Sequence, residues 1–205
     1  MLSLGAYRKN ISNFHDSITG VAATPAQVEQ FGLEPSYAGW ELRTTVNGGN
    51  ARVDGAEANV RQSLKPLGGW GRFFSVFANG TKLKLYGSRN AAFTRFIPES
   101  FNYGFTVTRN PVTLMLKWNG RGEQKQATST AQGPDANLYE EKRTTTDLNF
   151  TWQFKRQISL FANGRNIFNV HYTNLRYGSQ TPTYAKISTT RSYGVQWAFG
   201  IKGTF

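Results

Sequence analysis

The stretch that decides the fold class is Ser192-Tyr193-Gly194-Val195-Gln196-Trp197-Ala198-Phe199-Gly200-Ile201-Lys202-Gly203-Thr204-Phe205. In an extended strand, successive side chains point to opposite faces. Large apolar residues take one set of alternate positions: Tyr193, Val195, Trp197, Phe199, Ile201 and the terminal Phe205. Small or polar residues take the other set. The stretch is therefore predicted to be a strand with one broad aromatic face and one small or polar face.

Seven further segments alternate in a similar way, which predicts eight strands in total. They are Leu2–Asn13, Trp40–Leu64, Trp70–Tyr86, Phe101–Thr108, Val112–Asn119, Asp147–Phe154 and Ile158–Phe168. Within the second segment, Asn47-Gly48 is also a favourable hairpin turn, so one continuous strand and a hairpin both stay open. Within the third segment the alternation slips between Phe73 and Phe77, which predicts a β-bulge.

The connections between these segments alternate in length. Short turns follow Leu64, Asn110 and Phe154, whereas long polar connections follow Asn13, Tyr86, Asn119 and Phe168. Short turns at one end and long loops at the other are typical of a transmembrane β-barrel of the bacterial outer membrane, and the segments approach the ~9–11 residues that a tilted strand needs to cross a bilayer. We therefore predict an all-β, antiparallel transmembrane barrel in which residues 1–205 form a single region.

Composition supports this fold class. Only 39% of the residues are hydrophobic although 14% are aromatic, as expected for a barrel that is apolar outside and polar inside. No apolar run approaches the roughly 18 residues of a spanning helix. The inward set of Thr, Asn, Gln and Gly with scattered cations favours a wide, wet lumen, so the eight strands are predicted to be an arc of a larger barrel. The beginning of the chain does not resemble a signal peptide, which leaves a removed leader or a piece of a longer protein.

Other classes of function find little support in the sequence. The net charge of +12 suggests nucleic acid, but the cations are spread thinly and no nucleic-acid-binding motif is present, so no nucleic-acid partner is predicted. The chain has no cysteine, and its two histidines, His15 and His171, have only Asp16 as a close carboxylate. Glu140-Glu141 is followed at once by two cations. We predict no catalytic residues, no metal site and no cofactor.

The long loops are the predicted place of ligand contact, because loops on a rigid scaffold commonly carry function. The last long loop contains the first-choice residues, Tyr172, Arg176, Tyr177, Gln180 and Tyr184. The preceding long loop contains the second-choice residues, Arg121, Gln124, Lys125 and Gln126. Most other aromatic side chains are predicted to face lipid or to form interfacial girdles.

Several motifs resemble those of TonB-dependent outer-membrane receptors. The stretch Ile158–Asn169, followed by His171-Tyr172, resembles the penultimate strand of that family, with its Asn-aliphatic-Phe-Asn pattern. Arg52–Val60 resembles a recurrent strand of the family, and Leu2–Phe14 resembles the strand that precedes it. The aromatic C-terminal strand is similar to the family's last strand. The resemblance implies the C-terminal part of a plugged barrel of about 22 strands.

The resemblance also implies partners and a function. Outer-membrane lipid would surround the strands, and the barrel-assembly machinery would read a terminal signal formed by Trp197, Phe199, Ile201 and Phe205, although Gly203 stands where the family usually has an aromatic or aliphatic residue. The function would be uptake of a scarce small-molecule or glycan ligand, such as an iron chelate or a cobalamin-like molecule. TonB would act only through a plug, which nothing in this chain resembles. The alternatives are a stand-alone eight-stranded structural or adhesion barrel and a soluble, carbohydrate-binding β-sandwich.

Overall fold

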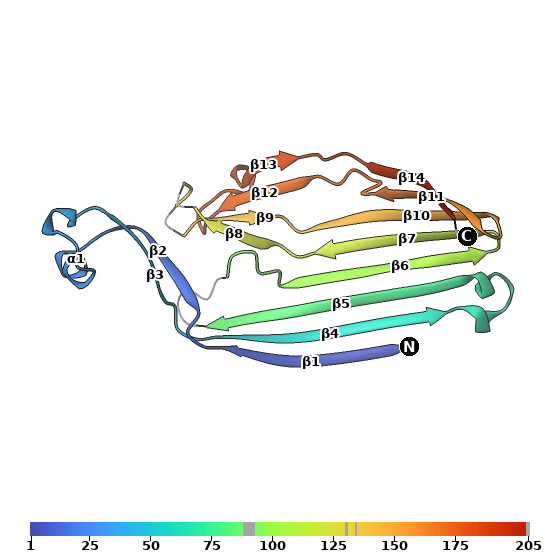
Figure 1. Ribbon diagram of the computed structural model, residues 1–205, viewed down its shortest axis with the longest axis horizontal. Helices are drawn as coiled ribbons and strands as arrows, with labels where there is room; N and C mark the ends of the chain where they lie inside the picture. Colours follow the sequence, from blue (N-terminus) through green and yellow to red (C-terminus); the bar gives the residue numbers. More distant parts are fainter. Residues whose placement is uncertain (88–92, 130, 134, 204–205) are drawn as a thin grey trace. The chain divides into compact units, whose positions relative to one another are not determined.

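The protein is built from antiparallel strands, as the sequence predicts. The computed structural model describes residues 1–87, 93–129, 131–133 and 135–203. Its main sheet has eight strands in the order β1 (Leu2–Ile11), β4 (Ala51–Ser63), β5 (Phe74–Gly87), β6 (Glu99–Arg109), β7 (Val112–Arg121), β10 (Arg143–Lys155), β11 (Ile158–Arg165) and β14 (Gln196–Gly203) (Figure 1). Within the described residues β1 and β14 are the two edges, so the sheet is an open arc rather than a closed barrel.

Strand register gives the arc one apolar face and one polar face. One row across β6, β7, β10, β11 and β14 consists of Val107, Leu114, Phe150, Ala162 and Phe199. The neighbouring row, which points the other way, consists of Thr106, Met115, Asn149, Asn163 and Ala198. The apolar side chains are not covered by the chain itself, since Phe199 is 71% exposed and Ile201 73% exposed. An apolar band exposed on one face of a sheet is what a lipid-facing wall requires.

The predicted bulge in the third strand is wrong. The pairing of β5 with β6 is continuous from Phe74 opposite Val107 to Lys82 opposite Glu99. Phe73 precedes the strand, in the 3-10 helix η3 (Gly69–Phe73), so its position does not belong to the alternation. Phe77 departs from the alternate positions of Phe74 and Val76, and Leu83 and Leu85 share its parity. Phe77 lies on the polar face against Gly104, whose missing side chain makes room for the ring.

The second predicted strand is two strands that belong to different sheets. β3 (Glu41–Asn47) pairs with β2 (His15–Ala22) in a two-stranded sheet, whereas β4 pairs in the main sheet. The chain changes sheet at Gly48 and Gly49, where Gly49 has a φ of 93° and donates its N–H to Asn47 Oδ1 over 2.8 Å. Neither a continuous strand nor a hairpin describes this point, because β3 and β4 do not pair with each other.

The connection His15–Ala38 is ordered, although the sequence reasoning assigned it to a polar loop. It contains β2, α1 (Pro25–Gln30) and the 3-10 helix η1 (Pro35–Tyr37). The short helix begins with a capping box, in which the Thr24 side chain accepts a hydrogen bond from Gln27 N at 3.3 Å and the Gln27 side chain accepts one from Thr24 N at 2.9 Å. Thr-Pro-x-Gln is a recognisable helix start, so the sequence did contain this signal.

The chain forms two compact units. One contains Met1–Tyr7, Asp54–Lys84 and the described residues from Phe93 onward, and the other contains Arg8–Val53 with the end of β5. The prediction of a single region over residues 1–205 stays a prediction. No helix among the described residues is long and apolar enough to cross a membrane. Of the predicted connection Gly87–Pro98, residues 88–92 lie outside the described residues.

Two predicted long loops are strands in a second sheet, which we call the loop sheet. It contains β13 (Ile187–Arg191), β12 (Tyr172–Tyr177), β9 (Asn137–Glu140) and β8 (Gln124–Thr128), in that order. The 3-10 helix η4 (Thr183–Ala185) lies between β12 and β13, and η2 (Lys65–Leu67) follows β4. Because β9 pairs with β12, the loop sheet joins the connection after β7 to the connection after β11.

Candidate ligand-binding site

A polar cavity of about 680 Å³ lies on the polar face of the arc, at the end next to the loop sheet. Its lining includes Lys117, Asp147, Asn163, Arg165, Tyr172 and Tyr193, and we call it the polar-face cavity. Register explains why these side chains meet, because Lys117 of β7 lies opposite Asp147 of β10, and Asn149 of β10 lies opposite Asn163 of β11. Each of these four residues occupies a polar position of an alternating strand.

Asp147 is held in a fixed position within this cavity. Asn119 Nδ2 donates to Asp147 Oδ2 over 2.8 Å, and Asn166 N donates to Asp147 Oδ1 over 3.0 Å. Both carboxylate oxygens therefore already have neutral donors. Neutral donors satisfy the carboxylate without cancelling its charge, which places one fixed anion beside Lys117 and Arg165.

The Asn-Ile-Phe-Asn motif after β11 shapes the chain around the cavity. Asn166 has a φ of 52° and Asn169 a φ of 50°, in the left-handed region that asparagine tolerates better than most residues. The Asn166 side chain donates to Val170 O over 3.0 Å and accepts from Val170 N over 2.9 Å. Asn169 Oδ1 accepts a hydrogen bond from Ser192 Oγ at 3.0 Å. The motif is thus a turn that ends β11 and directs the chain into β12.

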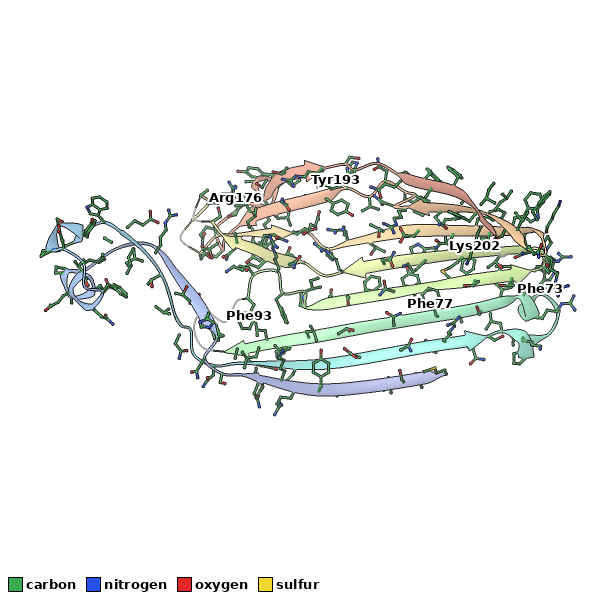
Figure 2. The ribbon with its side chains drawn as sticks, in the orientation of Figure 1. Phe73, Phe77, Phe93, Arg176, Tyr193 and Lys202 are labelled. Carbon is green, nitrogen blue, oxygen red and sulfur yellow. The ribbon has the colours of Figure 1, made fainter. Side chains whose placement is uncertain are left out.

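Tyr193 belongs to this cavity, which corrects the prediction that it lies on the aromatic face of the last strand. β14 begins only at Gln196, and Gly194 before it has a φ of 72°. That left-handed residue interrupts the alternation, so Tyr193 lies on the polar side and meets Tyr172 edge to face, with ring centroids 4.9 Å apart. Figure 2 labels Tyr193 next to the loop sheet.

A carboxylate flanked by two guanidinium groups lies where the main sheet meets the loop sheet. Glu140 of β9 forms ion pairs with Arg121 of β7 and Arg143 of β10, and Gln126 Nε2 donates to its other oxygen over 2.9 Å. Partial burial raises the pKa of Glu140, but the hydrogen bonds and charges of Arg143 and Arg121 outweigh it and hold that pKa below its ordinary value. The Arg143 guanidinium also lies 3.8 Å from the ring centroid of Tyr172.

The structure divides the five first-choice residues between different surfaces. Tyr172 and Arg176 are four residues apart on β12 and so share a face, and Tyr172 reaches the polar-face cavity. Tyr177 points the other way and stacks on Tyr139, with centroids 4.5 Å apart. Gln180 is an exposed loop residue, and Tyr184 of η4 is 89% exposed. The arrangement thus joins only Tyr172 and Arg176 to the side of the sheet that carries the cavity.

Tyr177 is held by a network on the far face of the loop sheet. Its hydroxyl donates to Glu123 Oε1 over 2.6 Å, and the Lys186 ammonium lies 4.9 Å from its ring centroid. Burial first, and then the hydrogen bond to Glu123, raises the pKa of Tyr177 well above its ordinary value. Together with the Tyr139 stack, these contacts tie β12 to β9 and to the residues just before β8 and β13, which gives this tyrosine a supporting role.

The second-choice residues are also distributed over both faces. Arg121 belongs to the ion pairs around Glu140, and Gln126 hydrogen-bonds the same carboxylate and Gln124. Gln124 is buried and donates to Arg95 O. Lys125 lies opposite Tyr139 and so shares the far face with Tyr177. The two predicted loops therefore do meet, through the pairing of β9 with β12 and through the contacts of Tyr177 with Tyr139 and Glu123.

Sequence reasoning placed the remaining cavity residues on strands and did not single them out as ligand contacts. Lys117, Asp147, Asn163 and Arg165 each occupy a polar position of an alternating strand. Alternation identifies such positions as lumen-facing, but it cannot say which of them lie at the same height. Register alone brings these four side chains together.

Comparisons with solved structures show first which fold the arc shares. The arc is similar to the ferric enterobactin receptor PfeA of Pseudomonas aeruginosa in complex with enterobactin, at 15% identity and a TM-score of 0.64, over 100% of this chain and 29% of that chain. It is similar to the siderophore receptor PirA of Acinetobacter baumannii, at 14% identity and a TM-score of 0.57, over 100% of this chain and 29% of that one. The receptor in the FpvAI–pyocin S2 complex matches at 14% identity and a TM-score of 0.61, over 98% of this chain and 25% of that chain.

The family follows from the sequence itself. A family model described as TonB dependent receptor-like, beta-barrel, matches residues 1–167, and the chain belongs to this family. The resemblance seen in the strand motifs is thereby confirmed, and so is the location in the outer membrane of Gram-negative bacteria. The chain spans less than a third of the length of the receptors it resembles. A comparison with curated proteins found no match.

Proposed function

We propose that this chain forms an arc of an outer-membrane receptor barrel that binds an anionic iron chelate in the polar-face cavity and takes part in its TonB-dependent import. The observation that carries the proposal is the pairing of β9 with β12. It joins the arginines of one connection to the tyrosines of the other beside a polar cavity. Arginine over an aromatic ring is a rigid, weakly hydrated cation that suits a planar anionic ligand.

Charge favours an anionic ligand over a neutral one. Arg165 and Lys117 line the cavity together with Asp147. Arg143 lies over Tyr172, which also lines the cavity, and Arg143 and Arg121 share the carboxylate of Glu140. A ligand that brings negatively charged oxygens would form charge-assisted hydrogen bonds with these cations.

An iron chelate fits these features better than a cobalamin-like molecule or a glycan. Catecholate chelates of iron carry several negative charges spread over aromatic oxygens, whereas a glycan offers neutral hydroxyl groups. The PfeA structures contain enterobactin, and PirA is described as a siderophore receptor. These similarities support the choice of ligand class for this chain.

The same proposal includes the completion of the barrel. β1 and β14 each present an unpaired edge in the described structure, and a lipid bilayer does not tolerate open sheet edges. Further strands would close the arc, and energy from TonB would act through a plug. The barrel-assembly machinery would recognise β14, whose Trp197, Phe199 and Ile201 lie on the apolar face; Phe205 lies outside the described residues.

The test compares two neighbouring charge removals. Arg143→Gln removes the cation that lies over Tyr172, whereas Lys142→Gln removes an exposed cation one residue earlier. Binding of a ferric tris-catecholate by the receptor in detergent is measured by quenching of tryptophan fluorescence. Arg143→Gln is expected to weaken binding about tenfold, the equivalent of one charged hydrogen bond, and Lys142→Gln to leave it unchanged.

A second chelate distinguishes loss of charge recognition from general damage to the receptor by the substitution. Binding of a ferric hydroxamate without net negative charge should be weak in the unaltered receptor and insensitive to Arg143→Gln. Equal affinity for both chelates, or equal loss in both variants, would exclude the anionic site proposed here.

A further inference from the structure

The short-turn end of the arc carries many cationic side chains and no Asp or Glu side chain. Seven cationic residues lie in or beside the turns that join β4 to β5, β6 to β7 and β10 to β11, and at the end of β14: Arg61, Lys65, Arg72, Arg109, Lys155, Arg156 and Lys202. These turns lie together at one end of the sheet (Figure 1). The stretches 58–98, 100–122 and 148–205 contain no Asp or Glu. This end is therefore uniformly positive.

Two of these cations lie on the apolar face of the sheet. Arg109 pairs with Val112, which pairs with Trp152, in line with the row that contains Leu114 and Phe150. Lys155 pairs with Ile158, whose partner on β14 is Gly203, two positions from Ile201 on the same face. The cations thus stand at the edge of the band that faces lipid, rather than over the lumen.

Aromatic rings lie directly beside these cations. The Arg109 guanidinium is 5.5 Å from the ring centroids of both Trp70 and Phe73, and Arg72 is 4.7 Å from that of Phe73. The Lys155 ammonium is 5.8 Å from the centroid of Phe154. Trp70 is 70% exposed and Phe154 54% exposed. Figure 2 labels Phe73 at this end of the sheet.

We propose that this cationic rim, formed by Arg72, Arg109 and Lys155 with Trp70, Phe73 and Phe154, binds the phosphate of an anionic phospholipid in the leaflet at the short-turn end. The rings lie at the border of the apolar band, where interfacial aromatics place themselves among headgroups. The guanidinium groups beside them match phosphate with paired hydrogen bonds. No Asp or Glu side chain of the stretches at this end competes with the lipid for the rim cations.

The position of the rim distinguishes lipid from an acidic protein. A protein partner at this end would reach the turns and the lumen mouth, where Arg156 and Lys202 border a polar cavity. Arg109 and Lys155 instead share the face of Phe150 and Phe199. A ligand that touches them must also tolerate acyl chains, which a phospholipid does. The proposal depends on the membrane location of the barrel and is independent of the chelate site.

The experiment measures lipid binding to the protein isolated from outer membranes in mild detergent. Native mass spectrometry records the bound fraction of phosphatidylglycerol and of phosphatidylcholine with the same acyl chains. The unaltered protein should prefer phosphatidylglycerol. Arg72→Gln with Arg109→Gln should weaken phosphatidylglycerol binding about tenfold, because each cation near an anionic membrane surface contributes measurably to binding. Phosphatidylcholine binding should not change.

Matched controls make the result specific. Arg95→Gln with Lys142→Gln removes two exposed charges at the opposite end and should leave lipid binding unchanged. If Arg72→Gln with Arg109→Gln reduces the folded, heat-modifiable fraction, Lys155→Gln with Arg156→Gln tests the rim at another turn. Equal binding of both lipids, or equal loss in both charge-removal pairs, overturns the proposal. Retention of an acidic polyglutamate peptide without preference for phosphatidylglycerol would also overturn it and assign the rim to a protein partner.

Discussion

Glu140 is the residue on which the candidate site depends most for its order. It joins Arg121 of one strand to Arg143 of another and receives a third hydrogen bond from Gln126. The carboxylate keeps two like-charged guanidinium groups close together, and without it they would repel each other. The same ion pairs limit the positive charge that a ligand meets, so Glu140 sets both the geometry of the arginines and their attraction for an anion.

Glu140 should make stability depend on pH in the acidic range. Its pKa is lowered in the folded protein, so its contribution to stability is present above the ordinary glutamate pKa and is lost as pH falls through the lower folded value. Glu140→Gln should lower the thermal midpoint at pH 7, by an amount equivalent to about 1–2 kcal/mol for a partly exposed ion pair. The two midpoints should converge as the pH falls below the lowered pKa of Glu140 in the folded protein. Parallel midpoints over the whole pH range would show that the ion pairs do not stabilise the fold.

At the scale of elements, alternation predicted the main sheet well and the loop sheet not at all. The eight strands of the arc each carry the two-residue repeat, and their number is confirmed. β8, β9, β12 and β13 are short and polar on both faces, so they lack the contrast that alternation needs, and their stability comes from pairing across distant connections. The same limit applies to Tyr193, because a single left-handed glycine reversed its face without changing the pattern.

The candidate site was also predictable only in part, because alternation shows the face of a residue but not its neighbours on other strands. Tyr172, Arg176 and Arg121 stand in the two connections that were expected to hold ligand, and the structure places Tyr172 at the cavity. Asn163 and Arg165 could be identified as polar-face residues but not as neighbours of Lys117. Their proximity depends on strand register, which a single sequence with many equivalent Thr and Asn positions does not determine.

Gly104 of β6 packs closely against the Phe77 ring of β5 and the backbone of β7, so a larger residue at this position should destabilise the sheet. A Cβ on Gly104 would meet the carbonyl oxygen of Leu116 and the ring of Phe77, whereas a Cβ on Gly80 would have no neighbour closer than 3.6 Å. Gly104→Ala should therefore lower stability by about 1–3 kcal/mol, the usual cost of overpacking, and Gly80→Ala by much less. The measurement is the fraction that migrates as folded protein on a heat-modifiability gel at increasing urea concentration. Equal transitions for both variants would contradict the packing described for Gly104.

At the scale of the whole molecule, the arc has a lipid-facing side and a lumen-facing side. The apolar rows end in the cationic rim, and the polar rows end in the cavity below the loop sheet. We propose that the lipid-facing side binds a phospholipid and that the lumen-facing side binds a chelate. The chelate site depends on the register that brings the polar positions of β7, β10 and β11 to one height.

The most direct test uses two neighbouring residues of β11 as single cysteines, which is straightforward because the sequence contains no cysteine. Asn163→Cys places a thiol in the polar-face cavity, and Ala162→Cys places one on the apolar face between Phe150 and Phe199. The receptor in its native membrane is treated with a charged, water-soluble thiol reagent, with and without a ferric tris-catecholate. We predict that only the cysteine at 163 is labelled and that the chelate slows its labelling. Labelling of both cysteines at the same rate, or labelling at 163 that the chelate leaves unchanged, would contradict it.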